Sequence, residues 1–147
     1  MNLILNAAEN KDWDSIDSLT SNMQKILQAV RFADFPVIAA PFGMVLGGGY
    51  EVVGACDKVI AAAELYCGLV EVGVGLIPGA GGNLRMILSA LGKETGRMGA
   101  FQKIKNAFEV IGFAKVATNA NQAKHLGYLE ESDTIIMNSD QLLFEAK

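Results

Sequence analysis

The chain has 147 residues, 51% of them hydrophobic, and a formal net charge of −4. This length suits one domain with a hydrophobic core, and the apolar content excludes a chain that is disordered throughout. The acidic balance disfavours nucleic acid and anionic membranes as partners.

Cysteine and histidine usage bounds the compartment and the metal chemistry. Cys56 and Cys67 do not form a C-x-x-C pair, and His125 is the single histidine. The sequence therefore predicts no disulfide framework and no metal site, in a reduced, cytoplasmic setting. The N-terminus lacks the basic start and apolar stretch of a secretory signal. Residues 35–56 are apolar enough to suggest a membrane span, but prolines, glycines and Glu51 interrupt them, which favours a buried strand and helix.

In chain order, the first predicted element is an amphipathic helix over residues 12–33, which ends before Pro36. Residues 37–40 are short and fully apolar, which is typical of a strand buried on both faces. Residues 41–43 are expected to turn the chain. A helix is then expected to begin at the triple glycine and to cover residues 47–55.

The remaining segments continue the alternation of strands and helices, which favours the α/β class. Residues 58–62 predict a second buried strand, and residues 65–67 predict a third. The later expected segments are a loop at 79–82, a helix at 83–91, a connector at 92–99, a helix at 101–111, a short helix at 121–126, a strand at 134–137 and a short helix within 139–147.

Glu51 is the only charged residue in the apolar stretch from residue 37 to residue 56. A carboxylate is costly to bury unless it is paired, hydrogen-bonded or used in proton chemistry. Glu51 comes shortly after Gly47-Gly48-Gly49, where a helix is expected to begin. The first N–H groups of a helix have no partner within the helix, so they favour an anionic oxygen. Glu71 lies ahead of a second glycine-rich loop. Two carboxylates in an apolar cleft can divide into an acid and a base, because burial and like charge separate their pKa values.

Plainer interpretations stay open at this stage. A triple glycine is commonly a tight packing turn, Glu51 can be a carboxylate that meets a helix dipole, and Glu71 can be a solvated loop residue. Residues 73–75 match part of a dinucleotide fingerprint, but Pro78 stands where its third glycine is needed. His125 is expected to be a surface or helix-end residue.

Two motifs together resemble the enoyl-CoA hydratase (crotonase) superfamily. The first contains Leu46-Gly47-Gly48-Gly49-Tyr50-Glu51, and the second joins Gly68-Leu69-Val70-Glu71 to Gly75-Leu76-Ile77-Pro78-Gly79-Ala80-Gly81-Gly82. Residues 69–78 and 114–129 are most similar to the hydratase part of bacterial multifunctional proteins named as 3-hydroxyacyl-CoA dehydrogenases. The resemblance covers nearly the whole chain.

The resemblance implies a partial crotonase-like α/β fold with a helical C-terminal part. It places a single partial domain at residues 1–147, with its core at 35–91 and a helical extension at 97–147. The implied activity is reversible addition of water to a 2-enoyl-CoA thioester in fatty-acid β-oxidation.

The resemblance also implies roles for individual residues. Glu51 matches the glutamate that helps to position and activate water, and Glu71 matches the glutamate that exchanges the proton at the α-carbon. Gly48 matches the glycine whose N–H forms half of the oxyanion hole. Further substrate contacts are expected at Gly47, Gly49 and Gly79. No metal or redox cofactor is needed for hydration: coenzyme A is part of the substrate, and NAD belongs to a domain outside these residues.

One departure from the family pattern affects the expected assembly. Asn2-Leu3 match residues that follow the family's other oxyanion motif, so the second amide donor is expected upstream of Met1. The chain therefore resembles the second half of a hydratase domain, and it is expected to form a homo-oligomer or to associate with the rest of the enzyme. The alternatives are an isomerase or thioester hydrolase of the same fold, and a non-catalytic structural or interaction module. The two glutamates favour hydration.

Overall fold

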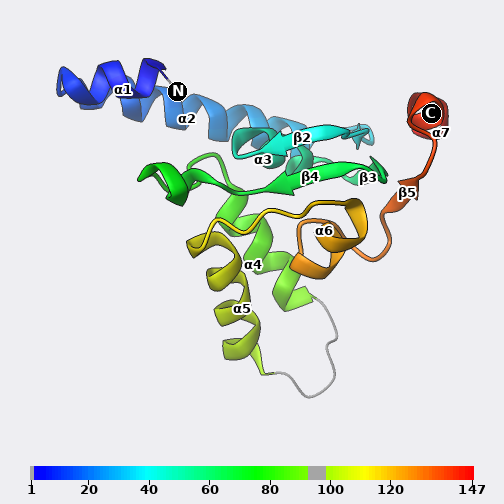
Figure 1. Ribbon diagram of the computed structural model, residues 1–147. Helices are drawn as coiled ribbons and strands as arrows, with labels where there is room; N and C mark the ends of the chain where they lie inside the picture. Colours follow the sequence, from blue (N-terminus) through cyan, green and yellow to red (C-terminus); the bar gives the residue numbers. More distant parts are fainter. Residues whose placement is uncertain (1, 93–98) are drawn as a thin grey trace.

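The computed structural model describes residues 2–92 and 99–147, which form two small parallel sheets with helices on both sides (Figure 1). The three-stranded sheet has the order β1-β3-β5, and the two-stranded sheet pairs β2 with β4. The strands are β1 (Ile38–Ala39), β2 (Gly43–Leu46), β3 (Lys58–Ala62), β4 (Leu65–Gly68) and β5 (Thr134–Ile136). This arrangement confirms the α/β class.

Helices connect and cover the strands. In Figure 1, α1 and α2 lie along one side of the strands, and α4 and α5 extend from the other side. The helices are α1 (Asn2–Glu9), α2 (Trp13–Arg31), α3 (Gly48–Ala55), α4 (Gly82–Gly92), α5 (Ala100–Gly112), α6 (Ala120–Leu126) and α7 (Leu142–Glu145), with single 3₁₀ turns η1 (Glu71–Val74) and η2 (Ser139–Gln141). No helix within the described ranges combines the length and the apolar character that a membrane crossing requires.

Local sequence signals account for where the helices begin and end. Asp12 lies just before α2, where its side chain accepts a hydrogen bond from the Ser15 N–H at 3.1 Å, so it is a cap and not part of the helix. Gly127 ends α6 in the left-handed conformation, with φ 86°. His125 is exposed in the last turn of α6, as predicted for a helix-end residue.

One predicted strand needs correction, and two elements were not predicted. The strand predicted at 37–40 is shorter than expected and is not buried on both faces, because β1 is an edge strand whose Ile38 is 44% exposed. The sequence pattern gave no sign of α1 or of β2, which begins at Gly43 directly after the predicted turn. Of the predicted connector at 92–99, residues 93–98 lie outside the described residues.

The main core is shared between the two halves of the chain. It joins Leu65, Cys67 and Leu69 on or beside β4 to residues contributed by α4, α5 and α6. Leu129, close behind α6, is 1% exposed in the same cluster. The C-terminal helices therefore pack against the strand that leads to Glu71, and they help to fix its position.

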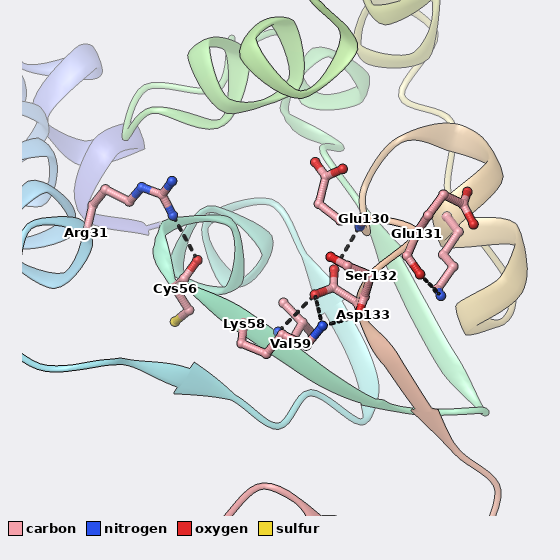
Figure 2. Close-up of polar contacts among 9 residues, drawn as sticks. Arg31, Cys56, Lys58, Val59, Glu130, Glu131, Ser132 and Asp133 are labelled. Atoms are coloured by element: carbon pink, nitrogen blue, oxygen red, sulfur yellow. Dashed lines mark hydrogen bonds and ion pairs between the residues drawn. The ribbon is translucent and has the colours of Figure 1, made fainter. Parts of the chain in front are cut away.

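Asp133 fastens β3 to the segment that leads into β5 (Figure 2). Its buried carboxylate accepts hydrogen bonds from the N–H of Val59 at 3.1 Å and the N–H of Glu130 at 2.7 Å. Lys58 Nζ lies 4.0 Å from the same carboxylate and also donates to the carbonyl oxygen of Ser132. Because these contacts satisfy a buried charge on several sides, they set where the chain enters β5.

Candidate active site

Both predicted glutamates follow the carboxyl ends of the paired strands β2 and β4. The register places Leu46 beside Gly68, and the N–H of Gly47 donates to the Gly68 carbonyl at 2.8 Å. Helix α3 begins at Gly48, immediately after β2, and η1 begins at Glu71, shortly after β4. Carboxyl ends of parallel strands share one edge of a sheet, where open α/β sheets bind their ligands. The fold therefore brings the two sequence motifs together.

The Glu51 carboxylate is buried and held by backbone amides. The residue is 5% exposed, and Oε1 accepts hydrogen bonds from the N–H groups of Ala80 and Gly82, both at 2.9 Å. Gly82 is the first residue of α4. Glu51 therefore meets a helix dipole, as the plainer interpretation expected, but the dipole is that of α4 and not of its own helix. The two amides fix the orientation of the carboxylate.

Gly82 leaves room for this arrangement. A Cβ atom at this position would lie 2.7 Å from Leu69 Cδ2 and 3.1 Å from Glu51 Oε1. The sequence pattern placed a loop at 79–82 but did not identify Ala80 and Gly82 as partners of Glu51. The only available signal was the glycine pair directly before the predicted helix.

The Glu71 carboxylate is enclosed, although the residue as a whole is only half-buried. Its Oε2 has no hydrogen-bond partner among the described residues, and a Cβ on Gly47 would lie 3.1 Å from its Oε1. Gly47 has φ 55°, a conformation that favours glycine. The solvated-loop interpretation does not describe this carboxylate.

The electrostatic setting of Glu71 favours its protonated form. Burial raises the pKa of its carboxyl group above the ordinary value of 4.5, and the charge of Glu51 raises it further. Backbone hydrogen bonds from Glu71 and Val70 act in the opposite direction and are outweighed. The site thus combines a carboxylate bound by two amides with a second carboxyl group whose pKa is raised above its ordinary value, which suits a division into base and acid.

Gly48 has the free space that an oxyanion donor needs. It is exposed, and apart from its chain neighbours and the backbone of its own helix no described atom lies within 4 Å of where its Cβ would be. As the first residue of α3, its N–H has no acceptor within the helix. Gly49 is also exposed, whereas Gly47 is buried against Glu71.

A cavity of about 310 Å³ opens beside Glu51, between α2 and the start of α4. Gly79 lines it, and the Gly79 carbonyl accepts a hydrogen bond from Gln24 Nε2 at 2.6 Å. Gly79, where a substrate contact is predicted, therefore lies at an opening beside Glu51, whereas neither Gly48 nor Glu71 lines this cavity. A second cavity of about 360 Å³, between α1 and α2, contains none of the predicted site residues.

Comparison with known proteins places this geometry in a family. The family model described as enoyl-CoA hydratase/isomerase matches residues 4–104. The chain is 39% identical over 145 residues to a probable 3-hydroxyacyl-CoA dehydrogenase of Bacillus subtilis (strain 168), covering 99% of this chain and 18% of that protein. It is 31% identical over 146 residues to a putative fatty acid oxidation complex trifunctional enzyme of Rickettsia felis, covering 99% and 19%.

Solved structures show the same fold. An enoyl-CoA hydratase from Bacillus anthracis superposes with a TM-score of 0.73 at 29% identity, covering 90% of this chain and 45% of that one. An enoyl-CoA hydratase from Thermoplasma volcanium gives a TM-score of 0.73 at 28% identity, covering 96% and 50%. The chain thus spans half or less of these hydratases and under a fifth of the two curated relatives above. A partial crotonase-like fold is confirmed, and the chain belongs to the enoyl-CoA hydratase/isomerase family.

Proposed function

We propose that the chain carries the enoyl-CoA hydratase part of a multifunctional fatty-acid β-oxidation protein. The reaction is reversible addition of water to the double bond of a 2-enoyl-CoA thioester. The observation that carries this proposal is the meeting of Glu51 and Glu71, from separate motifs, at one sheet edge beside the exposed Gly48. The names of the family model and of the solved structures support hydration, and the names of the two curated relatives support a multifunctional fatty-acid oxidation protein.

The proposed step balances with the groups at this edge. The water oxygen forms a bond to C3 while the double-bond electrons move toward the thioester carbonyl, whose oxygen the Gly48 N–H stabilises. Glu51 orients the water and accepts its proton, and protonated Glu71 supplies a proton to C2. Proton exchange with solvent then removes the proton from Glu51 and returns one to Glu71. The raised pKa of Glu71 supports its role as the proton donor.

The chemistry also bounds the cofactors. Adding water to a carbon–carbon double bond causes no net oxidation, so the step itself uses no redox cofactor. Coenzyme A enters as part of the substrate, and NAD is assigned to a dehydrogenase activity outside these residues. We also infer a cytoplasmic setting, which the free thiols of Cys56 and Cys67 support.

Hydration of crotonyl-CoA by the chain tests the proposal. The absorbance of the enoyl thioester is expected to fall with the wild-type chain, and Glu51→Gln and Glu71→Gln are each expected to slow this change by about 100-fold or more. Glu64→Gln is the matched control, because Glu64 is exposed between β3 and β4 and lies outside the site. A folded wild-type chain without hydration would contradict the catalytic proposal.

A second candidate function is that of an interaction module. It is favoured by large apolar side chains exposed on neighbouring helices: Leu84 and Leu88 on α4 are 56% and 52% exposed, and Phe101 and Phe108 on α5 are 80% and 71% exposed. Apolar groups displayed in this way are typical of surfaces that contact another chain. Self-association or association with the rest of a larger enzyme would cover them.

A further inference from the structure

Residues 115–117 run antiparallel beside β4, the strand that leads to Glu71. Cys67 and Ala117 exchange two backbone hydrogen bonds, of 3.1 and 2.8 Å. In an antiparallel ladder the next hydrogen-bonded pair lies two residues further along each segment, which places Leu69 opposite Lys115. A direct bond from the Leu69 N–H to the Lys115 carbonyl is therefore the expected continuation of this ladder.

The hydroxyl group of Tyr128 takes the place of that bond. It accepts a hydrogen bond from the Leu69 N–H at 3.2 Å and donates one to the Lys115 carbonyl at 2.7 Å. The Lys115 N–H donates elsewhere, to the Val110 carbonyl at 3.0 Å. The Leu69 N–H and the Lys115 carbonyl both have a hydrogen-bond partner. However, the inserted oxygen holds the two backbone segments further apart than a direct bond would.

Tyr128 is fixed in the core and stays a donor. It is 4% exposed and packs edge-to-face on Tyr50, with ring centroids 4.8 Å apart. Burial raises the pKa of Tyr128 to about 12, so the hydroxyl keeps its proton across the range in which carboxyl groups titrate. The Tyr128 hydroxyl therefore bridges the two backbone segments throughout the pH range in which Glu71 titrates.

Leu69 is placed to affect both glutamates. Glu71 follows it by two residues and begins η1, so the point at which the chain leaves β4 sets the position of the Glu71 carboxylate. The Leu69 side chain is fully buried, and its Cδ2 packs closely against Gly82, whose N–H holds Glu51. A shift of Leu69 would therefore reach the two carboxylates by two separate routes.

We propose that Tyr128 is a positioning residue for Glu71. Its hydroxyl ends the pairing of β4 with residues 115–117 and so fixes the geometry in which the chain turns into η1. The effect on catalysis rests on the proposed hydratase function, whereas the effect on the Glu71 carboxyl group does not.

Removing one hydroxyl group tests the role of Tyr128. In Tyr128→Phe, the Leu69 N–H and the Lys115 carbonyl lose their shared partner and are expected to draw together, which moves Glu71 out of its enclosure. The pKa of Glu71, followed by carbon-13 NMR of its carboxyl group in the whole chain, is expected to fall toward the ordinary value. Where hydration is measurable, kcat is expected to fall about 10- to 100-fold with little change in KM.

Tyr50→Phe is the matched control, since it removes a hydroxyl group from the neighbouring ring. Among the described residues, that hydroxyl donates its hydrogen bond to the Met86 sulfur at 3.5 Å and not to the backbone beside β4. Tyr50→Phe is expected to leave the Glu71 titration unchanged. A folded Tyr128→Phe chain with the wild-type Glu71 titration would overturn the proposal. Absent hydration in the wild-type chain would instead count against the hydratase function, and the titration would still decide the role of Tyr128.

A measurement on the unmodified chain guards against a variant that does not fold. If the Tyr128 hydroxyl binds the Leu69 N–H, that amide should exchange with solvent about as slowly as the paired amide of Cys67. Slow exchange at both would support the inserted hydroxyl. Fast exchange at Leu69 beside a protected Cys67 would refute it.

Discussion

At the scale of single residues, the site depends on two glycines as much as on two glutamates. Gly82 lets the backbone approach Glu51, and Gly47 lies against the carboxylate of Glu71. Gly47 also has a positive φ that other residues adopt at a cost. The positions of both carboxylates therefore depend on the absence of a side chain nearby.

Gly82→Ala is expected to destabilise the chain by about 1–3 kcal/mol, because the added methyl group overlaps Leu69 and crowds Glu51. Gly112→Ala is the matched control, since its added Cβ would make only ordinary contacts with the Phe108 ring at 3.8 Å or more. Chemical denaturation of both variants checks this. Equal stability of the two would show that the loop adjusts freely around Glu51.

The raised pKa of Glu71 predicts a pH dependence of stability. The folded chain binds this proton more tightly than the unfolded chain, so the free energy of unfolding falls as pH rises from about 4.5 through the folded-state pKa. Glu71→Gln removes that contribution. The stability of the wild type relative to Glu71→Gln should therefore decrease with rising pH in this range, as measured by thermal unfolding. Parallel curves for the two proteins would contradict the enclosed setting of Glu71.

At the scale of elements, sequence periodicity predicted the segments with strong local signals. Residues 58–62 match β3, and the helix expected after the triple glycine is α3. In contrast, β2 was missed because Pro41 and Gly43 mark a turn, and local pattern alone does not show that a glycine begins a strand.

The site was predicted in part from the sequence. The motifs gave Glu51, Glu71 and Gly48, and the fold places all three at one sheet edge. The contacts that hold the backbone at this edge could not be predicted from sequence motifs. The bond from Leu69 to Tyr128 joins residues 59 positions apart, and the inserted hydroxyl is defined only by three-dimensional contacts.

The link between β3 and β5 gives a prediction at this scale. Asp133→Ala leaves the N–H groups of Val59 and Glu130 without their acceptor, and it is expected to lower the free energy of unfolding by about 2–4 kcal/mol. Asp34→Ala, at an exposed aspartate, should change it by less than about 0.5 kcal/mol. Urea unfolding compares the two. Similar stabilities would mean that packing alone holds β5 on β3.

At the scale of the whole molecule, the apolar side chains exposed on α4 and α5 predict association. The chain is expected to sediment as a species larger than its mass of 15.6 kDa. Phe108→Glu, on the exposed face of α5, should shift the distribution toward the monomer. A monodisperse wild-type monomer that binds no hydrophobic dye would contradict this prediction.

We propose that the paired carboxylates add water across an enoyl thioester. Mass spectrometry of the product formed from crotonyl-CoA, in separate incubations with D₂O and with ¹⁸O-labelled water, tests it most directly. We expect the wild-type chain to form a 3-hydroxyacyl-CoA that carries deuterium at C2 in the first incubation and ¹⁸O at C3 in the second, and we expect Glu71→Gln to form neither product. Release of free coenzyme A, a shifted double bond or no labelled product from a folded chain would contradict it.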